Sequence, residues 1–317
     1  MPRQAYTAPM PLTMVAAKDD DGRRLDRILR KALPYLPLSA IHRMLRQDIV
    51  LVNDKPAAGA RRILEGEVIL VKDIINTPSV PGRPCEIKFG TRFPEILYEG
   101  EGLLFLNKPS GLSVHGKNSL EDLVHVYLKP KLPPSLSFKP GPLHRLDKPS
   151  SGLITFSTNI DGARGFSVLM RERKIKKQYL AIVEGLIEKT EFWRDELVRD
   201  GIQKKTFTPE NAETEGSKSA ITRVKPLMKN RDLTLILAEI ETGRTHQIRA
   251  QAAARRHPLL GDKKYGGVAK RGGFFLHAWR LEIPTIPHLI EAPLPENFQN
   301  KIRELFGQEF IPAKIAE

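Results

Sequence analysis

The segment 141–157 constrains the fold of this chain more than any other, because it places one carboxylate, that of Asp147, immediately before an apolar strand. Arg145 lies two residues before the aspartate, so permanent positive charge is close to it along the chain. A nucleophilic aspartate would be presented in this way. The alternative is an aspartate that only shapes the turn before the following Lys-Pro pair. The rest of the sequence has to decide between the two.

One later segment supplies a candidate partner for such a carboxylate, and another places an aromatic residue on a predicted strand. Tyr179 lies near the start of an apolar strand predicted at 176–183. A second predicted strand runs into the segment TGRTHQIR at 242–249, which ends on a predicted helix. Arg249 falls on the first turn or so of that helix and can point back at Asp147. A guanidinium in that position opposes protonation of the carboxylate and keeps it ionised.

Five stretches together resemble the motifs of the RluA family of RNA pseudouridine synthases. They are NKPSGL at 107–112, HRLD at 144–147 with SGL at 151–153, KQYLA at 177–181, TGRTHQIR at 242–249 and LHA at 276–278. HRLD alone is a short motif, and the order of its companions makes the likeness specific. Pro149 and Ser150 depart from the commoner form of the HRLD loop, whereas Asp147 is unchanged.

The resemblance implies that the chain isomerises uridine to pseudouridine with Asp147 as the nucleophile. Tyr179 would stack on the uracil and Arg249 would pair with the carboxylate, and these three are the predicted catalytic residues. The carboxylate would form a covalent intermediate at the sugar carbon or at the base, and the sequence leaves both routes open. Because the reaction involves no redox change, we expect no cofactor and no metal.

The predicted substrate-binding residues are Arg145, Leu276 and His144. By resemblance, Arg145 enters the RNA where the flipped uridine was and offsets the cost of flipping, which is about a few kcal/mol. Leu276 would form a wall of the uracil pocket. Tyr179 and Leu276 would look the same as ordinary core residues, so the sequence leaves that alternative open for both.

Composition favours a polyanionic partner. The 317 residues include 51 Lys and Arg against 37 Asp and Glu, a net charge of +14, which promotes association with nucleic acid. A basic enzyme without such a partner, or a basic membrane-surface protein, is the alternative. A single cysteine, Cys85, excludes an internal disulfide and fits the cytoplasm. Prolines interrupt the N-terminal apolar residues, so neither a signal peptide nor a membrane span is expected.

A small basic module is predicted at 21–73, with helices at 25–33 and 40–47, the second capped by Ser39, followed by strands at 49–52 and 68–71. This order resembles an S4 RNA-binding domain. The predicted RNA-binding residues are Arg23, Arg27, Arg43 and Arg46 in this module, with Arg173, Lys176 and Lys177 in the basic run 171–177. Solvated helix and loop surfaces would explain these charges almost as well.

The resemblance implies an α+β fold with a mixed, largely antiparallel central sheet and an active-site cleft across its middle. The predicted boundaries are an N-terminal extension at 1–20, an S4-like domain at 21–73, a linker at 74–92, the catalytic domain at 93–306 and a tail at 307–317. Structured RNA, most often large-subunit ribosomal RNA, is the expected substrate, and we expect a cytoplasmic monomer.

Two other functions remain open from the sequence. A non-catalytic RNA-binding or ribosome-assembly protein could keep the fold, although the set of Asp147, Tyr179 and Arg249 argues against it. A glycosidase-like hydrolase would need a second acid across the scissile bond, and no second carboxylate stands out in the motifs.

Overall fold

The computed structural model describes residues 10–74, 92–132, 135–201, 203–209, 214–268 and 273–311. The chain forms two compact units. The small unit comprises Met1–Thr91, Asp122–Gly141 and Thr158–Asp161, and the large unit comprises Arg92–Glu121, Pro142–Ser157 and Gly162–Glu317. Most of the predicted linker, at 75–91, and the last part of the predicted tail, at 312–317, lie outside the described residues.

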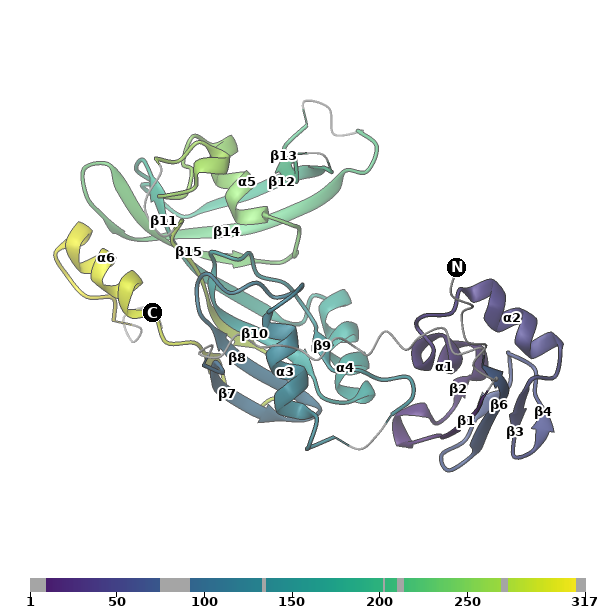
Figure 1. Ribbon diagram of the computed structural model, residues 1–317. Helices are drawn as coiled ribbons and strands as arrows, with labels where there is room; N and C mark the ends of the chain where they lie inside the picture. The colour runs from purple at the N-terminus through teal and green to yellow at the C-terminus, as the bar shows by residue number, and fades with distance from the viewer. Residues whose placement is uncertain are drawn as a thin grey trace, which may run out of the picture. The chain divides into compact units, whose positions relative to one another are not determined.

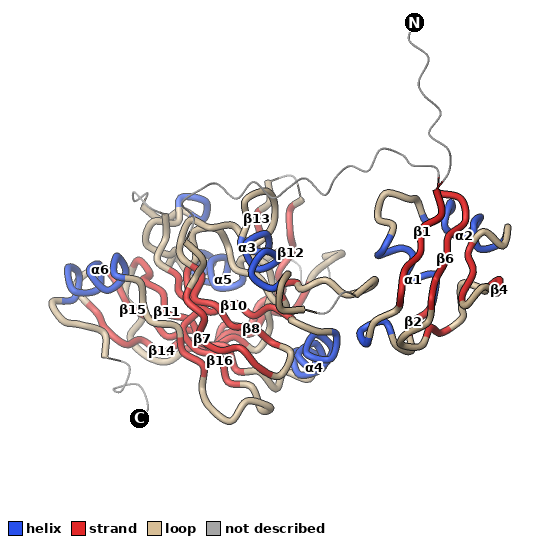
Figure 2. The backbone as a smooth tube through the Cα atoms, turned by 60° about the horizontal axis from the view of Figure 1, so that its bottom comes forward, coloured by secondary structure: helices blue, strands red, loops and turns tan. Residues whose placement is uncertain are grey.

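The small unit contains a four-stranded antiparallel sheet in the order β1-β6-β3-β4 (Figure 2). Its elements are β1 (Met10–Val15), the 3-10 helix η1 (Lys18–Asp20), β2 (Arg23–Arg24), α1 (Leu25–Ala32), α2 (Leu38–Arg46), β3 (Val50–Val52), β4 (Lys55–Pro56), β5 (Arg62–Ile63) and β6 (Val68–Ile74). The short strands β2 and β5 pair separately. Ile28, Ile41 and Val50 lie in one buried cluster, so the apolar faces of both helices cover this sheet.

Two features of the small unit differ from the sequence predictions. Ser39 does not cap α2, because the helix begins at Leu38 with Pro37 as its N-cap residue. Proline fixes the backbone φ at that position, −68°, which suits the entry to a helix. The strand β1 was not predicted. It contains Pro11, which has no backbone N–H to donate. An edge strand such as β1 tolerates proline because one side of the strand has no partner strand.

The large unit is built on one long sheet in the order β13-β12-β14-β15-β11-β16-β10-β8-β7, with β9 and β17 attached to β10 and β16. Its strands are β7 (Glu95–Gly100), β8 (Leu103–Lys108), β9 (Gly141–Pro142), β10 (Ser151–Ser157), β11 (Lys176–Glu184), β12 (Glu191–Asp200), β13 (Lys205–Phe207), β14 (Lys218–Lys229), β15 (Leu233–Ile240), β16 (Leu276–Glu282) and β17 (Ile290–Glu291). The pair β10–β16 is parallel, and its neighbours in the sheet are antiparallel. The predicted mixed, largely antiparallel sheet of an α+β protein is confirmed.

Both faces of this sheet are buried. Along β11, Tyr179 and Ala181 belong to one core cluster, whereas Leu180 and Ile182 belong to the other. The remaining helices are α3 (Leu120–Leu128), most of which belongs to the small unit, α4 (Ile160–Arg171), α5 (Gln247–Ala254), the 3-10 helix η2 (Lys263–Tyr265) and α6 (Glu296–Phe306). Helix α5 packs in the first cluster and α6 in the second, so the two helices cover opposite faces (Figure 1). None of the helices in the described residues is long and apolar enough to cross a membrane.

Candidate active site

Three adjacent strands bring the predicted site residues together at the centre of the sheet. The parallel pair β10–β16 aligns Gly152 with Ala278, and the antiparallel pair β11–β16 aligns Tyr179 with the same Ala278. The loop that carries Asp147 therefore ends beside the start of β16. Gly152 is required here, because its φ is +103° and a Cβ would lie 2.2 Å from the Ala278 carbonyl oxygen. This close approach explains the glycine of the SGL motif.

The carboxylate of Asp147 pairs with the guanidinium of Arg249, as predicted from the sequence. Nη1 of Arg249 donates to Oδ2 of Asp147 at 2.7 Å, and the Asp147 side chain is 19% exposed. Arg249 also donates to both oxygens of Asp262, from Nε at 2.6 Å and from Nη2 at 2.9 Å. Burial acts to lower the pKa of Arg249, but the hydrogen bonds and charges of Asp262 and Asp147 outweigh it and raise that pKa above its usual value. The guanidinium is therefore permanently charged and held by two carboxylates.

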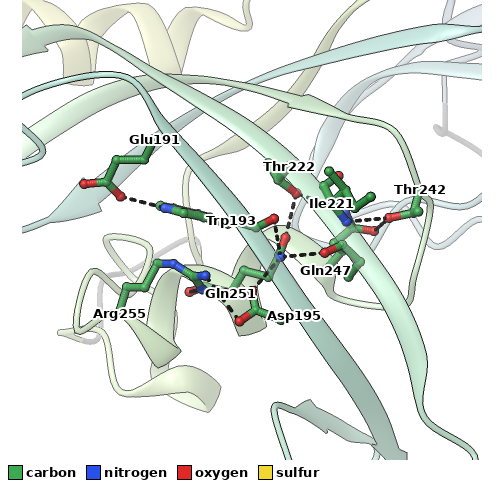
Figure 3. Close-up of polar contacts among 10 residues, drawn as sticks. Glu191, Trp193, Asp195, Ile221, Thr222, Thr242, Gln247, Gln251 and Arg255 are labelled. Atoms are coloured by element: carbon green, nitrogen blue, oxygen red, sulfur yellow. Dashed lines mark hydrogen bonds and ion pairs between the residues drawn. The ribbon is translucent and has the colours of Figure 1, made fainter. Parts of the chain in front are cut away.

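Two buried glutamines fix helix α5 to the sheet (Figure 3). This attachment sets the position of Arg249. Gln247 donates from Nε2 to the Ile221 carbonyl oxygen at 3.0 Å and to Oγ1 of Thr222 at 2.9 Å. Gln251, one helical turn later, accepts from Oγ1 of Thr222 at 2.6 Å. Arg249 lies midway between the two glutamines along the chain, so it projects from the opposite side of the helix. Anchoring one face of α5 on β14 thus aims Arg249 at Asp147.

A histidine that the sequence analysis did not single out also contacts the nucleophile candidate. Nε2 of His246 lies 3.5 Å from Oδ1 of Asp147, and Nδ1 lies 2.9 Å from the hydroxyl of Tyr265. That hydroxyl accepts from the backbone N–H of Thr206 at 2.8 Å, so its own hydrogen is free to be donated to Nδ1 of His246. Burial lowers the pKa of His246 to about 4 despite the opposing charge of Asp147. His246 is therefore neutral at pH 7 and lies directly beside the carboxylate.

Sequence reasoning also missed Asp262 and Tyr265, which lie in the segment GDKKYGG at 261–267. Its glycines and lysines are typical of a surface turn, and nothing in them indicates that the aspartate is buried against an arginine. The guanidinium of Arg249 lies over the rings of Tyr265 and Phe274, with its central carbon 4.8 and 4.3 Å from their centroids. A cation in such a position is stabilised by the faces of both rings.

These residues line a cavity of about 360 Å³ that opens beside the Asp147 loop. Its wall includes each predicted catalytic and substrate-binding residue: Asp147, Tyr179, Arg249, Arg145, Leu276 and His144. A volume in this range is typical of sites for small molecules or single groups. Asp147 is the one acidic residue among the described residues that line the cavity, and no group of His, Cys, Asp or Glu side chains in the described part of the chain is arranged to hold a metal.

The six predicted residues differ in exposure. Tyr179 and Leu276 are each 8% exposed, and burial followed by the charge of Asp147 raises the pKa of the Tyr179 hydroxyl. Arg145 is exposed at the wall of the cavity. His144 accepts the backbone N–H of Thr155 on its Nε2 at 3.0 Å, and burial lowers its pKa to about 4. This bond ties the HRLD loop to β10.

The predicted RNA-binding residues are mostly at the surface. Arg27, Arg43 and Arg46 of the small unit and Arg173 and Lys176 of the large unit are exposed. Two others are not free surface charges. Arg23 is partly buried and donates to the Ser137 carbonyl oxygen within the small unit at 3.3 Å, and Lys177 is 6% exposed.

A buried lysine joins the NKPSGL loop to the HRLD loop. Nζ of Lys108 donates to the carbonyl oxygens of Pro109 at 2.9 Å, Leu112 at 3.0 Å and Lys148 at 3.3 Å. Burial lowers its pKa to about 8, so it remains largely charged at pH 7. Because Lys148 follows Asp147 directly, Lys108 fixes the backbone beside the carboxylate. The NKPSGL turn therefore packs against the active-site loop.

Replacing Lys108 with methionine should lower the free energy of unfolding by about 3 kcal/mol, because it leaves buried carbonyl oxygens without their donor at about 1–3 kcal/mol each. Denaturant unfolding of the full chain measures this loss. Lys148→Met is the matched control, since only the backbone of Lys148 takes part in the contact. Equal stability of the two variants would contradict the structural role of Lys108.

Comparison with known proteins identifies the family. The model for RNA pseudouridylate synthase matches residues 102–254. The chain is 32% identical over 297 residues to ribosomal large subunit pseudouridine synthase D of Nitrosomonas europaea, covering 87% of this chain and 82% of that protein. It is 29% identical to ribosomal large subunit pseudouridine synthase C of Vibrio vulnificus, covering 91% and 94%.

Solved structures agree in fold. Human RNA pseudouridylate synthase domain containing 4 aligns with a TM-score of 0.57 at 23% identity, over 66% of this chain and 92% of the human one. The chain is an RNA-modifying isomerase of the pseudouridine synthase class. More narrowly, it belongs to the RluA family, as its motifs predicted.

Proposed function

We propose that this RNA pseudouridine synthase isomerises specific uridines of large-subunit ribosomal RNA, with Asp147 attacking a uridine that has been flipped out of the RNA. The observation that carries the proposal is the ionised pair of Asp147 and Arg249 at the wall of a cavity that also holds Tyr179. The substrate is supported by the relatives, several of which are named for the large ribosomal subunit. The net charge of +14 favours a polyanionic substrate.

In this mechanism the carboxylate of Asp147 forms a covalent bond to the nucleotide, either at C1′ of the ribose or at the uracil ring. The bond between C1′ and N1 breaks, the uracil turns, and C5 bonds to C1′ in its place. On the first route C5 displaces the carboxylate from C1′, and on the second the carboxylate leaves the uracil ring after the new bond has formed. C5 loses its proton and N1 takes one up, so Asp147 is regenerated as a free carboxylate. Arg249 pairs with the carboxylate and orients it, His246 lies beside it, and Tyr179 would provide a flat apolar surface for the turning uracil.

Arg145 would enter the RNA where the flipped base was, and Leu276 would contact the base itself; both residues line the cavity, which supports these roles. The small unit, by its helix order and its exposed Arg27, Arg43 and Arg46, would act as an S4-like RNA-binding domain. We further propose that the enzyme is cytoplasmic and works as a monomer. It should need no cofactor, because the isomerisation is redox-neutral and uses one carboxylate.

The test is release of tritium from ribosomal RNA transcribed with tritium at uridine C5. Isomerisation should release one tritium per modified uridine, because the C5 hydrogen is exchanged for the new glycosidic bond. A non-catalytic RNA-binding protein would retain the RNA on a filter without releasing tritium. A hydrolase would release free uracil that still carries its tritium. Either of the last two outcomes with the full chain would contradict the proposed function.

A further inference from the structure

Lys177 lies inside the active-site cavity rather than on the basic surface of the segment 171–177. It is 6% exposed and precedes Tyr179 by two residues on β11, so both side chains project from the same face of the strand and line the cavity. The preceding Lys176 projects from the other face, where it is exposed and pairs with Glu282 at 3.1 Å. Two adjacent lysines thus have different surroundings.

The ammonium of Lys177 has no strong acceptor among the described residues. Its polar contact there is with Sδ of Met170, at 3.8 Å, and a thioether is a weak acceptor for a group with three N–H donors. A Cβ placed on Gly243 would lie 4.0 Å from Nζ, so the ammonium is close to the TGRT turn. Burial, followed by the positive charge of Arg244, lowers its pKa to about 8, which leaves it mainly charged at pH 7.

Lys108 shows what a structural lysine looks like in this fold. It is fully buried, as Lys177 nearly is at 6% exposed, but its ammonium donates to three carbonyl oxygens. A buried charge without such partners costs free energy in the free protein. The cost is understandable if the partner is a ligand that arrives with the substrate.

The charges around the cavity indicate the sign of that ligand. Its lining includes Arg145, Lys177, Arg244 and Arg249 against the single carboxylate of Asp147. Arg249 already donates hydrogen bonds to two carboxylates, whose charges offset its own, whereas the charge of Arg244 acts on Lys177 with the same sign. The electrostatic potential around Nζ of Lys177 is therefore positive, which favours binding of an oxygen that bears negative charge.

We propose that Lys177 binds an anionic oxygen of the flipped nucleotide. This inference rests on the proposed function and adds a substrate-binding group to it. Two oxygens have the required chemistry. One is a backbone phosphate oxygen adjacent to the target uridine. The other is a uracil carbonyl oxygen: if Asp147 bonds to C1′, the electron pair of the bond from C1′ to N1 stays with the base, and its negative charge spreads to the carbonyl oxygens.

The test compares Lys177→Met, Lys177→Arg and Lys229→Met, a change at an exposed lysine of β14, in the full chain, with three measurements. Denaturant unfolding of Lys177→Met should show stability equal to or above the original chain, because an unsatisfied buried charge has been removed. Its tritium release in single turnover, or its affinity for the same RNA, should fall by at least about tenfold, since a charge-assisted hydrogen bond is lost. Lys177→Arg should recover part of this loss, and Lys229→Met should stay within twofold, because Lys229 is exposed, pairs with Glu188 and does not line the cavity.

A neutral methylphosphonate at the linkage on either side of the target uridine, in a short synthetic RNA, separates the two sources. If Lys177 binds a phosphate, one methylphosphonate weakens RNA binding to the original chain and Lys177→Met adds no further loss. If it binds the uracil, the two changes add, and Lys177→Met lowers the rate at saturating RNA.

The inference is wrong if Lys177→Met folds and keeps both rate and affinity within twofold, or if it loses several kcal/mol of stability as a structural lysine would. Absence of tritium release from the original chain would instead contradict the proposed function.

Discussion

Replacing Asp147 with alanine is expected to lower the single-turnover rate of pseudouridine formation by about 10⁴-fold or more, as removal of a nucleophile does in other enzymes that form covalent intermediates. The affinity for ribosomal RNA should change by no more than a few-fold, because phosphate contacts supply most of the binding free energy. The variant should fold, since Arg249 keeps both hydrogen bonds to Asp262. Tritium release and filter binding on the same preparation measure the two quantities.

Asp147→Asn is the control for shape. An amide oxygen can still accept from Nη1 of Arg249, but a neutral amide is a poor nucleophile, so this variant should be as inactive as the alanine variant and closer to the original chain in stability. Turnover retained by either variant would remove Asp147 from the mechanism. Loss of RNA binding in parallel with turnover would instead show that the carboxylate acts in substrate binding.

The centre of the site could be predicted because its residues lie in segments whose secondary structure is strongly encoded. The apolar runs that became β10, β11 and β16 are each flanked by turn residues, and the motifs at their ends are long enough to be specific. Arg249 was predicted from a helix that follows a strand, and the structure places its guanidinium 2.7 Å from Asp147. Asp147 and Arg249 are 102 residues apart in the sequence, so their pairing was predicted from the motifs and not from the local sequence pattern.

The supporting residues could not be predicted, because what fixes them is tertiary contact. Asp262 lies in a turn whose composition gives no sign of burial. His246 takes a left-handed backbone conformation, φ 55°, just before α5, and its contact with Tyr265 depends on how that turn folds back. Lys177 was grouped with its basic neighbours. The strand predicted from 176 onward, with its two-residue period, already placed Lys177 on the same face as Tyr179.

Replacing Asp262 with alanine is expected to lower both stability and turnover. Asp262 is 1% exposed and receives two of the three hydrogen bonds that Arg249 donates to carboxylates. Removing one partner of a buried ion pair costs about 3–5 kcal/mol, because the remaining charge is left uncompensated. The Arg249 side chain would also lose two of its three fixed hydrogen bonds and become mobile, so it would no longer hold the Asp147 carboxylate in one orientation. We expect the single-turnover rate to fall about 100-fold, a typical cost of misplacing a catalytic group by about 1 Å.

The matched control is Asp195→Ala. Asp195 pairs at 2.9 Å with Arg255, the C-cap residue of α5, and accepts from Gln251 at 2.7 Å, but it does not line the cavity. This variant should lose stability with a much smaller loss of turnover.

Combining Asp262→Ala with Arg249→Met should lower the free energy of unfolding by less than the sum of the two single changes, since both disrupt one interaction. If Asp262→Ala loses stability but turns over within twofold of the original chain, the orientation of Arg249 does not depend on Asp262, and the two hydrogen bonds serve the fold alone.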